Sequence, residues 1–241
     1  MSRNYIDFIS AYCDSWCERC AFTERCSHFA VTSALAMCDG NFEAALELAI
    51  GRAQDPGRKA QKTLRERMAE TLSDYEEPST TELEDIGREM DVRDRRVQQH
   101  PIAEASLDYS VAGRRWFEEH RGCDAPADVT VREALETLQR DLFFIHVKIM
   151  RALDRKDEDP EGVFWESSVQ NDWNGSAKVA LISIVRSDRA WRHIATVLGD
   201  AAAMVLADSL VSLRGALNAE FPRAMEFRRP GFDDQQGGAT D

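Results

Sequence analysis

The sequence predicts an all-α protein: a helical bundle preceded by a cysteine-rich helix-loop segment. Three observations support this. Apolar residues recur at steps of three and four over long stretches of the second half, which is typical of helices that bury one face. No stretch alternates apolar and polar residues for long enough to indicate a strand. Four of the six cysteines lie between Cys13 and Cys26, so the first forty residues differ in character from the rest.

The bulk composition limits the classes of partner. The chain has 241 residues and a formal net charge of -13, which disfavours a broad nucleic-acid-binding surface, because phosphate backbones require positive charge. No run approaches the roughly 18 apolar residues of a membrane-spanning helix. The first residues show no signal-peptide pattern. We therefore expect a cytoplasmic protein that does not contact the membrane and that meets a protein or redox partner.

The chain divides into four parts by composition. Residues 1–40 form the cysteine segment, which we expect to pack on the bundle, and residues 41–100 form charged amphipathic helices. Residues 101–228 form the core helical bundle. Residues 229–241 end in a glycine- and glutamine-containing tail that we expect to be mobile.

The cysteine segment has helical periodicity. Apolar residues and three cysteines recur every three or four positions over residues 5–20, which predicts one helix that carries these cysteines on one face. The residues that share this period are Tyr5, Phe8, Ile9, Tyr12, Trp16, Cys13, Cys17 and Cys20. Residues 23–26 are then expected to form a turn that returns the fourth thiol, that of Cys26.

Two kinds of helix follow. Residues 27–38 predict a short helix that ends at Asp39 and Gly40, and Asn41 is the expected N-cap of the next one, which extends to residue 50. Residues 58–75 and 81–99 predict helices that are rich in charge and carry only a thin apolar stripe. These charged helices are expected to project from the core or to cover one side of it.

The second half predicts four core helices. They span about 102–120, 130–153, 174–198 and 201–221, and Asp128 or Thr130 and Asn174 or Ser176 are the expected start signals of the middle two. The clearest apolar seam of the bundle comprises Val131, Leu135, Leu138, Leu142, Ile145, Ile149 and Leu153. On the first of these helices the expected buried face comprises Ala105, Tyr109, Ala112 and Trp116.

The four clustered cysteines point to metal chemistry. Cys13, Cys17, Cys20 and Cys26 have the spacing C-x3-C-x2-C-x5-C, and four thiolates bind either zinc or an iron–sulfur cluster. Zinc sites more often use two C-x2-C pairs that a longer insert separates, whereas this segment has one. The spacing therefore favours a [4Fe–4S] cluster, with zinc as the alternative and ordinary packing of small apolar thiols as the third.

The same residues resemble known cluster loops. Cys17-x2-Cys20-x5-Cys26 is similar to the three-cysteine core of the [4Fe–4S] loop in endonuclease III-type DNA glycosylases, RecB-type nucleases and WhiB-like redox regulators, where the fourth cysteine lies upstream, as Cys13 does. The resemblance covers about ten residues. The glycosylase, nuclease and WhiB-like motifs outside the loop are absent, so it implies a cofactor and no activity. Cys13-x3-Cys17-x2-Cys20 also matches the triad of radical S-adenosylmethionine enzymes, but no barrel strands accompany it.

Three functional hypotheses follow. The first is a [4Fe–4S] protein with a redox, sensing or structural role, in which Trp16, Phe22 and Phe29 shield the cluster. The second is a zinc-stapled helical module that binds a protein partner. The third is an enzyme that uses the bundle interior around His146 and Asp188.

Several residues have a structural and a functional interpretation. His146 is expected to be a hydrogen-bonded core histidine, or else to pair with a carboxylate such as Asp108, Glu136 or Asp188. Asp188 is expected to pair with Lys178, Arg186 or Arg192. Arg19 and Arg25 either offset the charge of a cluster or are solvated. Cys38 and Cys123 are expected to pack or to lie in loops, with a replacement-ligand role as the alternative.

Overall fold

The computed structural model describes residues 4–51, 78–120, 128–159 and 167–233, and throughout these ranges the regular elements are helices, with no strand. The all-α prediction is confirmed. The chain forms two compact units, one from residues 1–10 and 15–91 and the other from Ala11–Asp14 and Val92–Asp241. The predicted helix at 58–75, Cys123 and the tail beyond residue 233 lie outside the described residues. No described helix is long and apolar enough to span a membrane.

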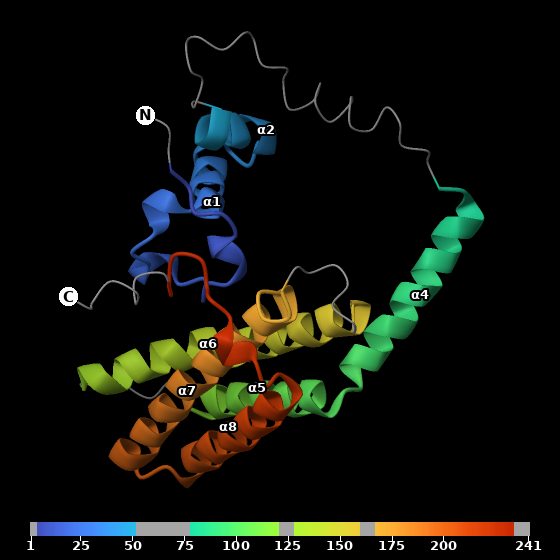
Figure 1. Cartoon of the computed structure of the whole chain (residues 1–241). Coiled ribbons are helices and arrows are strands. Elements are labelled where there is room, and N and C mark those ends of the chain that lie inside the picture. The colour runs from blue at the N-terminus through green and yellow to red at the C-terminus, as the bar shows by residue number, and fades with distance from the viewer. Residues whose placement is uncertain (1–3, 52–77, 121–127, 160–166, 234–241) are drawn as a thin grey trace, which may run out of the picture. The chain divides into compact units, whose positions relative to one another are not determined.

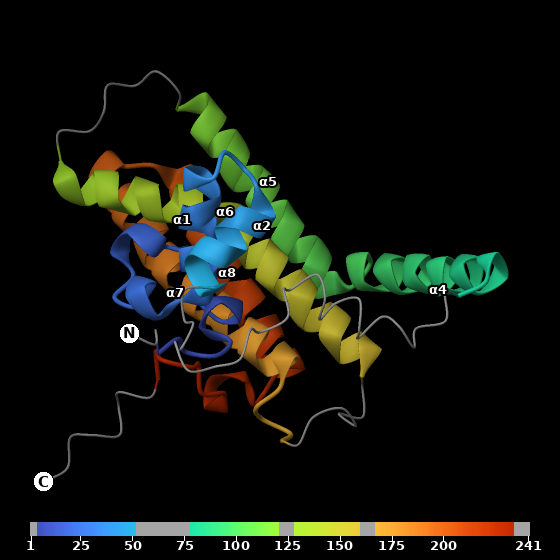
Figure 2. The same ribbon diagram turned by 90° about the horizontal axis from the view of Figure 1, so that it is seen from above.

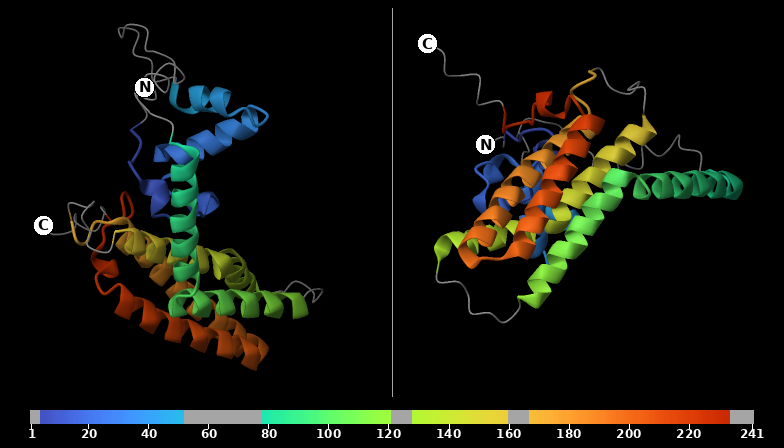
Figure 3. Two further views of the ribbon diagram at one scale, coloured as in Figure 1. Left: turned by 90° about the vertical axis from the view of Figure 1, so that its right-hand side faces the viewer. Right: turned by 90° about the horizontal axis from the view of Figure 1, so that it is seen from below.

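The second unit is built on four helices: α5 (Pro101–Glu119), α6 (Val129–Glu158), α7 (Asp172–Leu198) and α8 (Ala201–Glu220). Successive helices run in opposite directions, and α8 closes the ring against α5 (Figures 1 and 3). Each helix therefore has two neighbours and presents one apolar face to a shared core. The predicted bundle is confirmed.

The core follows the apolar seam of α6. Leu138, Ile145 and Ile149 are completely buried, and they pack with residues of α7 and α8, among them Ile184 and Leu210. Trp191 of α7 is also completely buried, and its indole N–H donates to the hydroxyl of Tyr109 at 3.0 Å. The completely buried indole of Trp191 thus has its polar atom satisfied.

The buried face of α5 differs from the prediction. Ala105 and Ala112 are exposed, whereas Ser106, Ser110 and Gly113 are buried. The Ser110 hydroxyl donates to the carbonyl oxygen of Leu142 at 2.6 Å, and a Cβ on Gly113 would lie 2.4 Å from a Leu142 methyl carbon. Small and hydroxyl-bearing residues therefore allow a close approach of α5 to α6 that apolar periodicity alone does not reveal.

Side-chain caps set where the helices start. Asp128 accepts from the backbone N–H of Thr130 at 2.8 Å, as predicted, and Asp200 caps α8 in the same way. Helix α7 starts two residues before the predicted positions because Asn171 acts as its cap, accepting from the N–H of Asn174 at 2.9 Å. Each cap satisfies an N–H donor that has no partner within the helix.

The first unit contains α1 (Ser27–Met37), α2 (Phe42–Leu46) and the following π-helical turn Glu47–Gly51. Helices α1 and α2 pack against each other around a small cluster of Ala34, Ala45 and Ala49 (Figure 2). Asp39 and Gly40 adopt left-handed backbone angles, with φ of 50° and 82°, and Asn41 caps α2. The predicted break and cap are confirmed.

Helix α4 (Thr80–Gln98) also matches its prediction. Its apolar residues Leu83, Ile86 and Met90 are each about half exposed, at 55%, 48% and 49%. Several carboxylates, among them Glu82 and Glu89, lie on the same part of the helix. α4 therefore presents an apolar stripe with acidic neighbours.

Replacing Gly175 with alanine is expected to destabilise the second unit by about 1–3 kcal/mol. The new Cβ would lie 2.4 Å from a ring carbon of Tyr12 and 2.8 Å from Phe227, and rigid rings cannot yield as a methyl group can. The matched control is Gly215→Ala in α8, where no atom lies within 4 Å. That variant should gain about 0.5–1 kcal/mol in urea unfolding, since alanine is the better helix former. Equal unfolding midpoints for the two variants would contradict the expected packing.

Candidate metal centre

The predicted helix over residues 5–20 is wrong. The segment contains only two three-residue 3₁₀ turns, Ile9–Ala11 and Cys17–Arg19, and the backbone of Phe8 and Ser15 is left-handed, with φ of 60° and 56°. Left-handed residues interrupt a helix because they point its hydrogen bonds elsewhere. Cys13, Cys17 and Cys20 therefore do not share one helix face, and residues 5–26 form a loop with short turns ahead of α1.

Cys13 belongs to a tetrapeptide, Ala11–Asp14, that is anchored on the bundle. The Tyr12 hydroxyl donates to Asp172 at 2.9 Å, and the Tyr12 ring packs on Phe227 with the centroids 4.6 Å apart. Lys148 donates to the carbonyl oxygen of Ala11 at 2.9 Å, and Asp14 pairs with Arg186 at 2.5 Å. The residues on both sides of Cys13 are thus held by α6 and α7.

Charge at this anchor is balanced. Arg151 makes two hydrogen bonds to Asp172, at 2.7 and 3.0 Å. Burial raises the pKa of Tyr12, and the Asp172 carboxylate adds to the rise, so Tyr12 remains a neutral donor over the physiological range. Burial lowers the pKa of Lys148, and so does Arg151, while Cys13 and the carboxylates of Asp172 and Asp14 oppose this. Cys13 therefore lies within electrostatic reach of an ammonium group.

Cys17, Cys20 and Cys26 lie in the first unit, where short turns position them. Cys17 begins one 3₁₀ turn, which Cys20 closes by donating its N–H to the Cys17 carbonyl oxygen at 3.2 Å. The 3₁₀ turn Thr23–Arg25 leads to Cys26, as the sequence predicts. Cys26 is then the N-cap of α1.

Two of these sulfurs accept backbone hydrogen bonds. The N–H of Phe22 donates to Cys20 Sγ at 3.4 Å, and the N–H of Phe29 donates to Cys26 Sγ, also at 3.4 Å. Backbone donors of this kind stabilise negative charge on sulfur and tune the potential of thiolate-bound metal. Each of these two sulfurs therefore has a backbone donor within a short turn.

The surrounding aromatic and basic residues are only partly buried. Trp16, Phe22 and Phe29 are half-buried, and shielding of a cluster by these rings stays a prediction. The guanidinium of Arg19 lies 4.2 Å from the Trp16 ring centroid, and Arg25 donates to the carbonyl oxygen of Asn4 at 3.2 Å. Both arginines are exposed and hold the local turns together, so the structure gives each a structural contact.

The described cysteines are all half-buried: Cys13, Cys17, Cys20, Cys26 and Cys38. Within the described ranges, no group of three or more histidine, cysteine, aspartate or glutamate side chains is gathered as a metal site. Cys13 belongs to one unit and the other three members of the quartet to the other. Convergence of the four thiols on one centre therefore stays a prediction.

The interior of the bundle offers structural partners to its candidate catalytic residues. His146 Nδ1 lies 2.8 Å from the Ser106 hydroxyl, and burial lowers the pKa of His146, which favours its neutral form. Asp188 accepts from Arg192 at 2.8 Å, so the predicted pairing with a nearby cation is confirmed. His146 thus has a serine as its described partner instead of the carboxylate that a catalytic pair would need, and Asp188 is held in an ion pair.

The sequence pattern did not predict one buried ion pair, which joins α6 and α7. Asp141 of α6 is completely buried, and Arg186 of α7 donates to both of its carboxylate oxygens at 2.5 Å. Burial raises the pKa of Asp141, and the guanidinium opposes that rise. The available signal was a charged residue beside the apolar seam residues Leu138 and Leu142.

Comparison of the chain with protein-family models, with curated proteins and with solved structures finds no match. The similarity of residues 17–26 to known cluster loops is thus confined to the spacing of three cysteines. Function must be inferred from the residues and their contacts.

Proposed function

We propose that Cys13, Cys17, Cys20 and Cys26 hold a [4Fe–4S] cluster that serves a redox, sensing or structural role. The observation that carries this proposal is the pair of backbone hydrogen bonds to Cys20 Sγ and Cys26 Sγ within short turns. The bond to Cys26 Sγ also caps α1, whereas Cys20 Sγ accepts from Phe22 without capping a helix. A cysteine that packs only as a small apolar group needs no such donor. The four half-buried cysteines provide the ligand set that such a cluster takes.

Chain connectivity supports the inclusion of Cys13. Four residue steps separate Cys13 from Cys17, so their Cα atoms lie at most about 14 Å apart whatever the backbone does. The anchor of Ala11–Asp14 fixes the backbone around Cys13 through Tyr12 and Asp14. Ordering before binding lowers the entropic cost of closing a ligand loop.

The residues around the thiols have distinct tasks. A [4Fe–4S] cluster supplies one-electron redox chemistry or a rigid cross-link. The N–H groups of Phe22 and Phe29 stabilise charge on sulfur, and the Lys148 ammonium acts on Cys13. Trp16 and Phe29 limit access of water. Cysteines clustered for metal binding fit a reducing compartment such as the cytoplasm.

The zinc-stapled interaction module is the second candidate, and a separate observation favours it. The exposed apolar stripe of α4, Leu83, Ile86 and Met90, with its acidic neighbours, is suited to a protein partner that offers apolar and basic groups. A redox partner would use the same acidic surface under the first proposal. The net charge of -13 makes nucleic acid an unsuitable partner for either.

Anaerobic purification followed by metal and sulfide analysis tests the proposal. We expect about four iron and four sulfide per chain, a brown colour and broad absorption near roughly 400 nm. Equimolar zinc without sulfide would establish the alternative instead. Protein that contains neither metal, and that takes up neither after reconstitution with iron and sulfide or with zinc, would refute both.

A further inference from the structure

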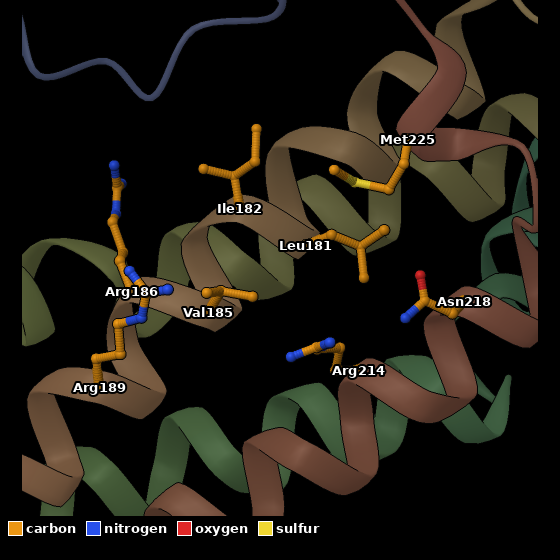
Figure 4. Close-up of a pocket in the computed structure, with 8 residues that line it drawn as sticks. All are labelled: Leu181, Ile182, Val185, Arg186, Arg189, Arg214, Asn218 and Met225. Carbon is orange, nitrogen blue, oxygen red and sulfur yellow. The ribbon is translucent and has the colours of Figure 1, made fainter.

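A cavity of about 370 Å³ lies between α7, α8 and the short 3₁₀ turn Ala224–Glu226. Figure 4 shows Leu181, Ile182 and Val185 along α7, with Arg214 and Asn218 facing them from α8. Met225 covers one end from the 3₁₀ turn. All these residues belong to the second unit, so one rigid group of helices forms the cavity.

The charge of this cavity is opposite to that of the chain. Arg186, Arg189 and Arg214 line it, and its lining contains no carboxylate. Arg186 is already neutralised by Asp141 and Asp14. Within the part of the chain that the structure describes, Arg189 and Arg214 form no ion pair, although acidic residues outnumber basic ones by 43 to 30. Two guanidinium groups therefore remain available to an anion.

The floor of the cavity is apolar. Leu181 is buried at its base, Ile182 and Val185 are half-buried, and Met225 is exposed at its edge. A small inorganic anion would gain nothing from this apolar floor. A ligand that combines an apolar body with one anionic group uses both parts of the lining.

We propose that this cavity binds a small amphipathic carboxylate, with its apolar chain on Ile182 and Val185 and its carboxylate between Arg189 and Arg214. Guanidinium groups match carboxylates through paired hydrogen bonds. A volume of about 370 Å³ lies in the range of small-ligand sites and suits an alkyl carboxylate of about eight carbons. This binding site is independent of the proposed metal centre.

A second cavity provides an internal comparison. It has a volume of about 570 Å³, lies between α5 and α8, and is lined by apolar residues such as Ile102 and Leu213, with Asp108 in place of arginines. Apolar ligands without charge suit this cavity equally well, but a carboxylate should avoid it. The site of binding therefore distinguishes charge recognition from general apolar binding.

Titration of the full-length protein with octanoate and with the neutral octanamide tests the proposal. Calorimetry should show that octanoate binds at least about fivefold more tightly than octanamide, because contacts to exposed charged groups contribute energies of this scale. Methyl signals of Ile182 and Val185 should shift in NMR spectra. The preference for octanoate over octanamide should disappear in Arg189→Gln and in Arg214→Gln. It should persist in Arg115→Gln, which alters an exposed position of α5.

Four outcomes would overturn the proposal. They are equal affinity for octanoate and octanamide, no binding of octanoate up to its solubility limit, equal weakening by Arg115→Gln, and octanoate-induced shifts at Leu206 and Leu213 instead of Ile182 and Val185. All three glutamine variants alter exposed helix positions, so their folding can be verified by circular dichroism before titration.

Discussion

Replacing Cys20 with serine should lower the metal content of anaerobically purified protein by at least about tenfold, because a hydroxyl is a poor substitute for a thiolate ligand. Cys20 is the cysteine to replace first, because its sulfur accepts a backbone hydrogen bond from Phe22. The same loss is expected for Cys17→Ser and Cys26→Ser. Iron, zinc and sulfide analysis per folded chain measures the effect.

Cys38→Ser is the matched control. Cys38 is also free and half-buried, but it lies at the end of α1, where it packs against the small alanine cluster and closes the helix through its backbone N–H. Its replacement should leave the metal content unchanged. Equal loss for Cys38→Ser and Cys20→Ser would mean that unfolding, and not ligand removal, releases the metal.

Cys13→Ser determines how many thiols take part. Cys13 lies in a segment held by Tyr12 and Asp14 on the bundle, in a different unit from the other three cysteines. A four-thiolate centre predicts the same loss as for Cys20→Ser. Retention of metal by the Cys13→Ser variant alone would restrict the centre to Cys17, Cys20 and Cys26.

The helices that sequence analysis predicted well are those whose signals are local. The α6 seam from Val131 to Leu153 repeats over six turns, and Asn41 and Asp128 are caps that act within three residues. Such features depend on neighbours along the chain. They predict helices whether or not the rest of the fold is known.

The features that were missed depend on distant residues. The aromatic residues before Cys13 repeat as in a helix, but Tyr12 fits against Gly175 and Phe227 and bonds to Asp172, all more than 150 residues away. This tertiary contact determines the backbone there. In α5, the close approach to Leu142 selects Ser110 and Gly113 for burial over the more apolar Ala112.

The cysteine spacing likewise predicts local structure but not contacts with distant residues. It correctly indicated the turn that leads to Cys26, because few residues separate the thiols. It carried no information on the bundle residues that hold the chain around Cys13, such as Lys148 and Arg186. Whether four sulfurs share one metal depends on those distant contacts, so it must be measured.

Replacing Arg186 with methionine should cost about 3–5 kcal/mol of stability at neutral pH, because it leaves a buried carboxylate without its cation. Asp141 is completely buried and, among the residues that the structure describes, would keep the weak hydrogen bond from Ser187 at 3.2 Å. Methionine fills much of the volume of the arginine stem. The loss of stability therefore comes more from the unpaired carboxylate than from a cavity. Urea unfolding of the folded variant measures it.

The effect of Arg186→Met should depend on pH in a defined direction. Burial raises the pKa of Asp141, and removal of the guanidinium removes the main opposing influence, so the pKa in the folded variant rises further. The folded state then retains a proton that the unfolded chain releases near about pH 4. Stability of the variant must fall as the pH rises through that value, until the folded carboxyl group also ionises. The deficit relative to the parent protein is therefore smallest near pH 4 and largest at neutral pH.

A second substitution separates charge from packing. Asp141→Asn in the Arg186→Met background removes the ionisable group, so this double variant should regain stability at neutral pH and lose the added pH dependence. Arg223→Met, which breaks an exposed pair with Glu226, should leave the urea unfolding midpoint nearly unchanged. If Arg186→Met is as harmless as Arg223→Met, or if its deficit is the same at pH 4 and pH 7, then the buried carboxylate does not depend on its arginine.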